Sequence, residues 1–507
     1  MSEPSWSAGY PVDRDYDYVF VPQMTPASLA LVALQQGLRA PDASRFRYFE
    51  LGAGFGMMSL LMAAANPDAE VWANDFMPNH VLEARTIAEE ASLSNAHFLE
   101  DSFEELVDRE LPEFDFIGLH GVYSWVSEAN RRAIVEFIRR RLKTGGLVYV
   151  SYNSPAGFGP IAPLRQLMNS VAAAMGGTSE RHVRQAFDVV SKLAEVKASY
   201  LGLNQLMPGF ERVKKRKLGY LVGEFFTRNW NLFLHTDVAK ELADAKLSYV
   251  ASARLLDDLL PLTSTPQQIE MVRQIPDRGV QENVKDFLAG RTLRRDAFAR
   301  GTSSLGSAKE RLEALFKVRF VLLLPRASCS YNVNVQDGDL TLLEHVHGPL
   351  LDELGKGPST LAELVETAAL KSLDHDATAN ALLALVAVGY AAPYVEPTDK
   401  AKESSQRLNN AIFRRAAGPR PLPCVAAPAT GHGLVVSQTN QVLLQANRLG
   451  ADPIEYAGEQ MQRAGKRLMR DGKPIENADE HLLALRNLER EFRENEAPLF
   501  RRLGIMA

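Results

Sequence analysis

The chain has little cysteine and no long apolar run, and each shortage excludes a class of structure. Its 507 residues include two cysteines, Cys329 and Cys424, which cannot make a disulfide framework or a zinc site built from cysteines. A chain so poor in cysteine is expected in a reducing compartment, and we predict a cytoplasmic location. The longest nearly apolar stretch, residues 379–393, is shorter than the roughly 20 residues of a membrane-spanning helix, so we expect no membrane insertion. The opening Met1-Ser2-Glu3-Pro4 lacks the features of a signal peptide.

The chain also lacks a large excess of either sign of charge. The 57 lysines and arginines are nearly balanced by 62 aspartates and glutamates, for a formal net charge of -5. This charge does not favour nucleic acid as a partner. The basic run 212–217 has no aromatic residues among its charges on which bases could stack, and we interpret it as a solvated helix end. His345 and His347 lack a third ligand at helical spacing, so we expect no metal site.

What the chain does contain is an alternation of short apolar runs with amphipathic stretches. Between residues 45 and 152 each run of strand length is followed by a turn and then by a helical stretch. Such alternation predicts a parallel sheet with helices on both faces, the Rossmann-like α/β fold class. The expected strands are 46–51, 70–74, 96–100, 114–119 and 147–152. The expected helices are 26–38, 57–65, 78–91 and 127–142, the last closed by Gly145 and Gly146.

The alternation fades after residue 152, and the length of the chain predicts about three domains. A helix at 236–245 and a strand at 247–251 either complete the first sheet or open a second domain, and the pattern leaves both open. Residues 350–397 suggest three helices and an extended piece, an order similar to a winged helix. Further expectations are helices at 160–175, 179–200 and 477–493, a strand at 318–324, a solvated linker at 400–406 and a loop at 419–428.

The sharpest motif is Phe49-Glu50-Leu51-Gly52-Ala53-Gly54-Phe55-Gly56, between the first expected strand and the next helix. Parallel sheets bind ligands at the carboxyl ends of their strands, where glycines let the backbone bend and approach the ligand. The spacing is G-x-G-x-G, and Met57 stands where a dinucleotide loop has its last glycine. A loop preceded by Glu50 suits a cationic ligand without phosphate, such as S-adenosylmethionine, better than a pyrophosphate. Taken alone, the triplet also fits a tight turn without a ligand.

Acidic residues follow at the ends of the next two strands. Asp75 ends the second strand, where a carboxylate can accept both ribose hydroxyls, and Phe76 follows it. Asp101, Ser102 and Phe103 end the third strand, where an acid or amide can read the adenine amine and a ring can lie on the base. One such acid can be a helix cap by chance, but acids at both strand ends favour an adenosine site. The predicted cofactor residues are Glu50, Gly52, Gly54, Gly56, Asp75, Phe76, Asp101, Ser102 and Phe103.

These residues, with the turn 142–146, resemble the class I methyltransferases that use S-adenosylmethionine. Segments 18–26, 120–126, 152–154 and 220–253 further resemble bacterial methyltransferases with a regulatory domain, a group that includes protein-lysine methyltransferases. The resemblance implies a methyltransferase domain at 1–216, a regulatory region at 217–300 and a C-terminal part at 301–507 with a winged-helix-like segment. One departure is the turn after Asn153, where Ser154-Pro155-Ala156-Gly157-Phe158 replaces a Leu-Pro-Gly-Trp-like sequence.

The resemblance implies methyl transfer to an amine, and a lysine side chain of a protein substrate is the first expectation. We predict His120 and Tyr123, after the fourth strand, as catalytic residues. Tyr123 would offer an aromatic face to the methyl-bearing cation, and His120 would take the amine proton or accept a hydrogen bond beside the cofactor. A histidine that only packs in the core would fit position 120 equally well. Aromatic residues at the spacing of Trp125 and Tyr152 belong to the core as often as to a pocket. The predicted acceptor residues are Trp125, Tyr152 and Asn153, and Tyr18 is expected to close over the cofactor.

Other functions stay open at this point. The chain fits a small-molecule methyltransferase whose C-terminal half serves as a lid or as the interface of a homodimer. It also fits a cofactor-binding protein without turnover that holds a partner through its C-terminal parts. A nicotinamide oxidoreductase is disfavoured by Met57, which replaces the last glycine of the dinucleotide loop.

Overall fold

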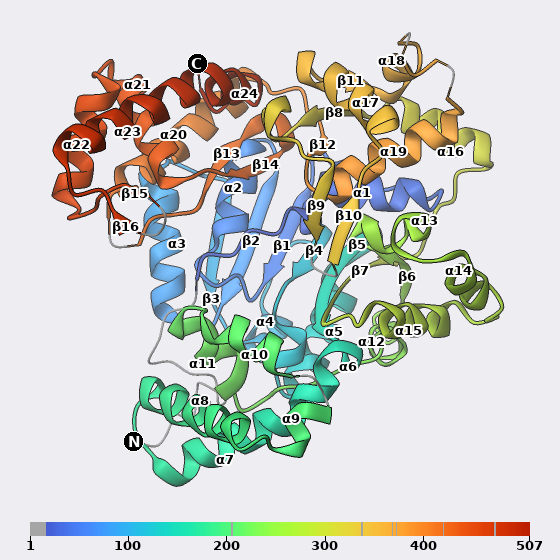
Figure 1. The fold of residues 1–507 in the computed structure, drawn as a ribbon. Coiled ribbons are helices and arrows are strands. Elements are labelled where there is room, and N and C mark those ends of the chain that lie inside the picture. The colour runs from blue at the N-terminus through green and yellow to red at the C-terminus, as the bar shows by residue number, and fades with distance from the viewer. Residues whose placement is uncertain are drawn as a thin grey trace.

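The computed structural model describes residues 17–203, 206–335, 338–367, 369–371, 373–418, 420–470 and 473–506. Its centre is a seven-stranded sheet with the order β3-β2-β1-β4-β5-β7-β6 (Figure 1). Neighbours from β3 to β5 run parallel, and β7 runs antiparallel to both β5 and β6. The strands are β1 (Arg47–Leu51), β2 (Glu70–Asp75), β3 (Ala96–Glu100), β4 (Phe114–Leu119), β5 (Leu142–Asn153), β6 (Leu247–Ser252) and β7 (Leu293–Arg300).

Both faces of the sheet are buried, because alternate side chains of each strand enter two different cores. On β1, Tyr48 enters one core and Phe49 the other, and on β5 Tyr149 and Val150 divide in the same way. The first core includes α1 (Pro26–Gln35), α2 (Met57–Ala65) and α3 (Pro78–Glu90). The second includes α4 (Phe103–Asp108), α5 (Glu128–Arg141) and α12 (His235–Ala243). This arrangement confirms the Rossmann-like fold class.

The strand expected at 247–251 completes the central sheet as β6, which resolves the alternative that the sequence left open. Its neighbour β7 was not predicted, because Arg294, Arg295 and Asp296 interrupt the apolar pattern of a buried strand. The expectation that Gly145 and Gly146 close the preceding helix is wrong. Helix α5 ends at Arg141, and both glycines lie within β5.

The described residues between 162 and 226 form a helical lobe with its own core, which lies below the sheet in Figure 1. Phe187 stacks on Phe210 with ring centroids 4.9 Å apart. The helix expected at 179–200 ends at Glu195, because Lys197 has a φ of +54° that a helix cannot continue through. The helices are α7 (Ala162–Met175), α8 (Ser179–Glu195), α9 (Ser199–Leu203), α10 (Met207–Lys214) and α11 (Leu218–Phe226).

The region between α12 and residue 318 adds short helices around β6 and β7. They are α13 (Leu260–Thr263), α14 (Pro266–Arg273), α15 (Arg278–Ala289) and α16 (Ala308–Phe316), and α6 (Pro155–Phe158) follows β5. A small sheet then forms from β8 (Arg319–Leu322), β11 (Ser359–Thr360) and β12 (Ala391–Pro393), with the hairpin β9 (Asn332–Val335) and β10 (Gly338–Thr341) nearby in sequence. Its helices are α17 (Glu344–Lys356), α18 (Leu361–Val365) and α19 (His375–Ala387).

Elements from residue 399 onward, among them α20, pack onto the first half of the chain, and two expectations for this part are wrong. Residues 400–406 are not a linker but part of α20 (Asp399–Arg415), whose small residues Ala401, Ser404 and Ser405 are buried. Residues 419–428 are not all loop, because they contain β13 (Cys424–Ala427), which pairs with β14 (His432–Val435). The remaining elements are α21 (Gln438–Leu449), α22 (Pro453–Arg463), β15 (Met469–Arg470), β16 (Lys473–Pro474), α23 (Ala478–Glu491) and α24 (Ala497–Arg502).

Candidate active site

Strand β1 leads into the glycine loop, which we define as residues 52–56. Gly52, Gly54 and Gly56 have φ values of +66°, +54° and +67°, a region that glycine enters without steric cost. A Cβ on Gly52 would lie 2.6 Å from the side chain of Val122, and one on Gly56 would lie 2.6 Å from that of Phe98. A Cβ on Gly54 would meet no described atom within 4 Å. The loop is therefore closely packed at its two ends and open at its middle, where a ligand can approach the backbone.

Asp75, at the end of β2, is already engaged by the chain. Its Oδ2 accepts a hydrogen bond from the backbone N of Gly54 at 2.8 Å. Its Oδ1 accepts one from the N of Met77 at 2.9 Å and lies 3.1 Å from Nδ1 of His80. A carboxylate offers about four lone-pair sites, so this arrangement leaves one for a ligand. It provides for one ribose hydroxyl, where the sequence predicts two.

His80, in the first turn of α3, is a polar residue at this position that sequence reasoning missed. Its side chain is buried, and its Nε2 has no hydrogen-bond partner in the part of the chain that the structure describes. When Nδ1 donates to Asp75, Nε2 becomes an acceptor. Asp75 and His80 would together then offer two acceptors, the number that a ribose diol requires.

The end of β3 supplies a further unused acceptor. The Oδ1 of Asp101 accepts from Nη1 of Arg109 at 2.9 Å, whereas its Oδ2 is buried without a partner among the described residues. An unpaired buried carboxylate oxygen fits the exocyclic amine of adenine. The ring of Phe103 lies 3.7 Å from a Cβ built on Gly52, so this aromatic residue reaches the glycine loop. The donor and acceptor pattern of these residues therefore fits an adenosine ligand.

Two other predicted cofactor residues lie beside this group. Ser102 is the N-cap of α4, since its Oγ accepts from the N of Glu105 at 3.3 Å and its own N donates back to the Glu105 carboxylate at 2.8 Å. Phe76 is half-buried next to Asp75. The capping role of Ser102 leaves its proposed role toward the cofactor a prediction.

Glu50 lies in the interior, under the start of the loop. It is 6% exposed, and its carboxylate accepts a hydrogen bond from the hydroxyl of Ser59 in α2. Burial raises the pKa of Glu50 to about 7, although the hydrogen bonds from Ser59 act in the opposite direction. Glu50 is thus poised between its neutral and charged forms near pH 7, and a nearby cation would favour the charged form.

Tyr18 reaches the same loop from the N-terminal segment. Its hydroxyl donates to Oε1 of Glu83 in α3 at 2.8 Å, and its ring centroid lies 5.1 Å from that of Phe55. The side chain therefore spans from Phe55 in the glycine loop to α3. This position is compatible with the predicted closing role.

His120 follows β4, and its Nδ1 lies 2.8 Å from the hydroxyl of Tyr149. Burial, together with the positive charge of Arg295, lowers the pKa of His120 to about 3. Moving a proton to this imidazole from a lysine ammonium would be uphill by about 10 kcal/mol. The environment of His120 therefore disfavours the role of a base.

The contact with Tyr149 bears on which nitrogen of His120 carries the proton. When the Tyr149 O–H donates to Nδ1 of His120, Nε2 carries the imidazole hydrogen. A neutral imidazole with Nε2–H donates to an anionic group, such as the carboxylate of an amino-acid ligand.

Other parts of the chain enclose the side chain of Tyr123. Its side chain is fully buried, and its hydroxyl donates to the carboxylate of Glu241 in α12. Its ring packs on Phe233 with centroids 5.7 Å apart, and the guanidinium of Arg131 lies 5.9 Å from the ring. Because the chain encloses the ring, this position does not support the predicted role as an aromatic face for the cofactor.

The three predicted acceptor residues separate into different surroundings. Trp125 is half-buried in the short helix that follows β4, η3 (Tyr123–Trp125). Asn153, at the end of β5, donates its backbone N to Oγ of Ser124 at 2.8 Å, and its buried Nδ2 has no partner among the described residues. Tyr152 precedes it on the strand and therefore points to the opposite face of the sheet. Tyr152 and Asn153 thus do not line one pocket together.

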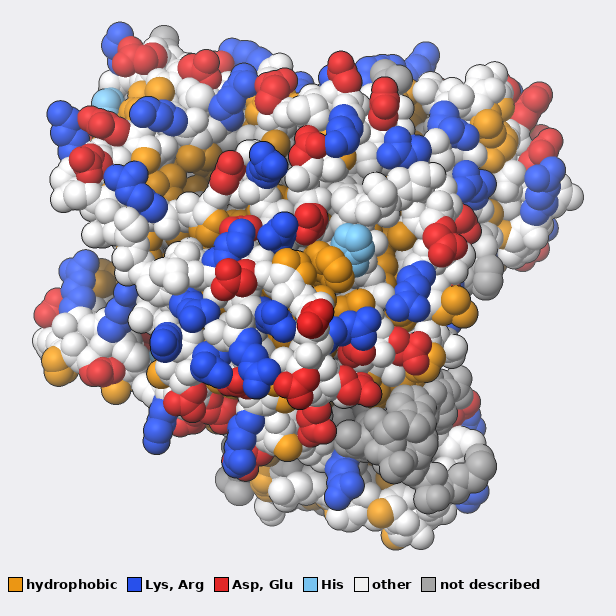
Figure 2. Space-filling model, turned by 180° about the vertical axis from the view of Figure 1, so that it is seen from behind, with side chains coloured by type: hydrophobic (Ala, Val, Ile, Leu, Met, Phe, Trp, Pro, Cys, Tyr) orange, Lys and Arg blue, Asp and Glu red, His pale blue; other side chains and the backbone are white. Residues whose placement is uncertain are grey.

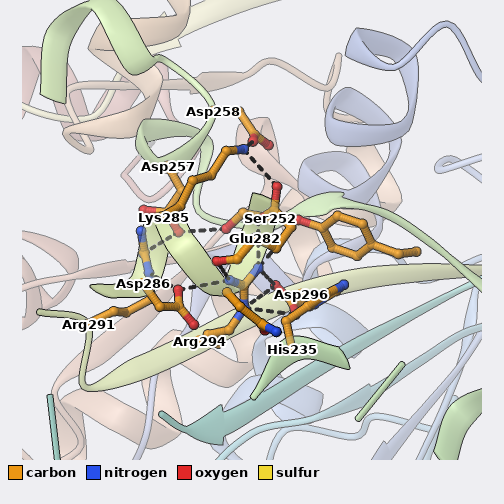
Figure 3. A network of polar contacts seen from close by, with 12 residues as sticks. His235, Ser252, Asp257, Asp258, Glu282, Lys285, Asp286, Arg291, Arg294 and Asp296 are labelled. Carbon is orange, nitrogen blue, oxygen red and sulfur yellow. Dashed lines mark hydrogen bonds and ion pairs between the residues drawn. The ribbon is translucent and has the colours of Figure 1, made fainter. Parts of the chain in front are cut away.

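Tyr152 instead contacts His235 and Asp296, which belong to a buried polar network that Figure 3 shows. Its hydroxyl donates to Asp296, and it lies 3.3 Å from Nδ1 of His235. Burial acts to raise the pKa of Asp296, but the cation of Arg294 and the hydrogen bond from His235 outweigh it and hold that pKa below its usual range. Arg294 pairs with Glu282 at 2.9 Å, Asp286 at 2.8 Å and Asp296 at 2.9 Å. Figure 3 also shows Ser252, Asp257, Asp258, Lys285 and Arg291 around this centre.

The surface shows no broad field of one charge on the face seen in Figure 2, where described cationic and anionic side chains are interspersed. Within the described ranges, no group of three or more His, Cys, Asp or Glu is placed to hold a metal ion. None of the described helices combines the length and the apolar character that crossing a bilayer requires.

Comparison with known proteins points to one class. The family described as "Methyltransferase domain" matches residues 49–148, and the family described as "Predicted methyltransferase regulatory domain" matches residues 217–300. An uncharacterized protein of Synechocystis sp., sll1526, is 35% identical over 507 residues, which cover 99% of this chain and 100% of that protein. An uncharacterized protein of Rickettsia prowazekii, RP789, is 24% identical over 272 residues, which cover 53% of this chain and 48% of that protein.

The fold is shared with a solved structure along nearly the whole chain. PKMT2 from Rickettsia typhi in complex with AdoHcy superposes with a TM-score of 0.69 at 16% identity, covering 94% of this chain and 98% of that one. The sheet and the matched domains define an S-adenosylmethionine-dependent methyltransferase. The chain belongs to the methyltransferases that carry a methyltransferase regulatory domain, and it shares its family with the Synechocystis protein.

Proposed function

We propose that the protein transfers the methyl group of S-adenosylmethionine to the uncharged amine of a lysine side chain in another protein. The observation that carries the proposal is the fold that this chain shares with PKMT2 over 94% of its length, well beyond the methyltransferase sheet. The sequence resemblance to protein-lysine methyltransferases supports the same acceptor. Regions outside the sheet would then serve a macromolecular substrate.

The cofactor site follows from the donor and acceptor pattern around the glycine loop. Asp75 and His80 would accept the two ribose hydroxyls, Asp101 would accept the adenine amine through Oδ2, and the open middle of the loop at Gly54 would face the ligand. His120, as an Nε2–H donor, would bind the carboxylate. The bound cofactor supplies an electrophilic methyl group on a sulfonium.

The acceptor amine has to lose its proton before it can attack. His120 is unsuited to take that proton, because its pKa is about 3. Apolar surroundings and a nearby positive charge both lower the pKa of an ammonium group, so we infer that the amine releases its proton to solvent as it enters. The side-chain amide of Asn153, with its buried Nδ2, would orient the neutral amine or the substrate backbone. Most of the chain's contribution is then positioning and the exclusion of water.

We also propose the division into a methyltransferase domain at 1–216, a regulatory region at 217–300 and a C-terminal part at 301–507. In that last part, α17, α18, α19 and β12 follow one another in the order of a winged helix. Helix α19, the third, buries most of its residues. A buried helix cannot enter a nucleic-acid groove, which favours a structural or protein-binding use of this unit.

The acceptor class is tested with radiolabelled S-adenosylmethionine and a bacterial lysate, before and after removal of protein. Label that stays in protein and is recovered as methyllysine after hydrolysis supports the proposal. Label in the small-molecule fraction would instead indicate a small-molecule methyltransferase. The absence of label in either fraction, with cofactor binding intact, would indicate a binding protein. An Asp75→Asn variant serves as the control for background transfer.

A further inference from the structure

The C-terminal part of the chain packs directly against the helix that the glycine loop opens. All nine residues of α2 are buried, and their sequence, Met-Met-Ser-Leu-Leu-Met-Ala-Ala-Ala, has no exposed polar face. The central sheet covers one side of α2, and α20, β13 and β14 contact the other (Figure 1). A helix that is apolar all round is one that needs cover all round. The C-terminal part therefore completes the burial of the cofactor helix.

Polar contacts fix the C-terminal cover of α2, which we define as α20, β13 and β14, against the first half of the chain. Asn66, at the end of α2, donates through Nδ2 to the carbonyl of Gly431 at 2.7 Å. Arg407 of α20 donates to the carbonyl of Ala91 after α3 at 3.0 Å. A Cβ on Gly433 would lie 2.7 Å from Leu61, so the β13–β14 hairpin approaches α2 very closely. These contacts hold α20 and the β13–β14 hairpin against α2 and α3.

Arg420, which lies after α20 in the chain, has its cation beside the glycine loop. Arg415, in the last turn of α20, pairs with Glu90 of α3 at 2.6 Å, and the hydrogen bond lowers the pKa of Glu90. Five residues further on, the guanidinium carbon of Arg420 lies 5.0 Å from the ring centroid of Phe55. This distance is within the range of a cation–π interaction. Arg420 is exposed, so the loop is reached from the solvent side.

Phe55 is the largest side chain of the glycine loop, and three parts of the chain meet on it. Its ring centroid lies 5.1 Å from that of Tyr18 and 4.3 Å from that of His80. Gly54 and Gly56 flank it, and both have positive φ. Glycines give a loop many accessible conformations, so an ordered loop needs contacts from its one bulky side chain. Arg420 supplies such a contact from the opposite end of the sequence.

We propose that Arg420 is a positioning residue for the cofactor, by which the C-terminal part holds Phe55 and thereby the glycine loop in the binding conformation. This inference rests on the cofactor site proposed above. It assigns the C-terminal part a role in cofactor binding in addition to any role toward the protein substrate. An exposed cation–π contact corresponds to about a two- to fivefold change in affinity.

The test is calorimetric titration of full-length variants with AdoHcy and with 5′-methylthioadenosine, which lacks the amino-acid carboxylate. Arg420→Ala is expected to raise the Kd of both ligands by the same factor of about two to five, because it acts through the loop. Arg420→Lys, which keeps a cation, is expected to restore most of the affinity. Arg414→Ala is the matched control, since Arg414 lies on α20 3.6 Å from Glu90 and is 51% exposed. Melting temperatures of the variants should equal that of the natural chain.

Three results would overturn the inference. Unchanged affinity of Arg420→Ala for both ligands would show that the contact with Phe55 does not position the loop. A loss for AdoHcy alone would show that Arg420 binds the carboxylate directly instead of acting through the loop. An equal loss in Arg414→Ala would indicate a general charge effect. If the natural chain itself binds neither ligand, the proposed cofactor site fails, and that outcome is distinct from the other three.

Discussion

Nδ1 of His80 lies 3.1 Å from Oδ1 of Asp75, and both side chains are buried beside the glycine loop. In the proposed site, the pair would give the end of β2 two acceptors for the ribose hydroxyls. Replacing Asp75 by Asn keeps its shape but turns one acceptor oxygen into a donor. We expect at least a tenfold rise in the Kd of AdoHcy, since hydrogen bonds to charged groups contribute about 1.5–3 kcal/mol. Calorimetric titration measures the Kd, and circular dichroism checks that the variant is folded.

His80→Phe tests whether the two residues act together. The phenylalanine ring preserves the packing on Phe55, whose centroid lies 4.3 Å from that of His80, and removes both nitrogens. We expect the affinity losses of His80→Phe and Asp75→Asn to be non-additive in the double variant, with a coupling of about 0.5–3 kcal/mol. Strictly additive losses in the calorimetric cycle would show that the ribose is not shared between them.

The raised pKa of Glu50 should make the free energy of unfolding depend on pH. Its pKa of about 7 in the folded chain exceeds the ordinary value of 4.5, so the folded state binds more protons between these pH values. The free energy of unfolding should therefore fall as the pH rises from about 4.5 to about 7. Glu50→Gln removes this loss and should stabilise the unliganded chain at pH 8 by up to about 3 kcal/mol, with little gain at pH 4.5. Urea denaturation at both pH values measures the difference, and an equal effect at both would contradict the assignment.

His120 predicts the opposite trend. Its pKa is about 3 in the folded chain and 6.5 ordinarily, so the unfolded chain binds more protons between these values. Stability should be lost as the pH falls from about 6.5 toward 3. His120→Gln should make this decline shallower in urea denaturation. The profile of kcat/KM against pH should contain no limb near pH 6.5 that depends on His120. A limb near pH 6.5 that is present in the natural chain and lost in His120→Gln would indicate that His120 acts as a base.

Replacing Arg294, which lies away from the proposed cofactor site, should cause a large loss of stability. Arg294→Met would leave Glu282, Asp286 and Asp296 buried without their common cation. Breaking a buried pair from one side costs about 3–5 kcal/mol. Arg132→Met is the matched control, because Arg132 is 76% exposed and its pair with Glu128 should contribute less than about 1 kcal/mol. Comparable losses from the two variants would indicate that the network does not stabilise the chain.

The sequence predicts the parallel half of the sheet well, because its strands are short continuous apolar runs bounded by turns. Each expected strand from β1 to β4 lies within one residue of its observed bounds. Strand β7 was missed for a physical reason: Arg294 and Asp296 are charged, and their neutralisation by Glu282, Asp286 and His235 depends on contacts distant in sequence. No local sequence pattern predicts such a network.

The apolar sequence of α2 indicates that another part of the chain must cover this helix. An apolar helix of nine residues directly after the glycine loop requires cover on the side away from the sheet. The helix α20 provides part of this cover, and its residues 400–406 were predicted to be a linker because the buried residues there, such as Ala401 and Ser405, are small. Small residues permit close helix approach without an apolar stripe.

The candidate site is recovered in part by the same reasoning. The glycine loop, Asp75 and Asp101 were predicted from their places at strand ends, and the roles assigned to them stay predictions. His80 and Arg420 were missed, since one lies in a helix and the other lies 365 residues after Phe55. Tyr123 and Tyr152 have their rings in the interior, where aromatic residues fill the core as often as a pocket.

The central claim is that the glycine loop binds an adenosine ligand that carries a sulfur and an amino acid. Titration of the full chain with AdoHcy and, separately, with NAD tests it most directly. We expect one AdoHcy bound per chain, an affinity at least tenfold weaker in Asp75→Asn, and no saturable heat with NAD. Saturable binding of NAD, with no heat from AdoHcy or S-adenosylmethionine, would contradict it.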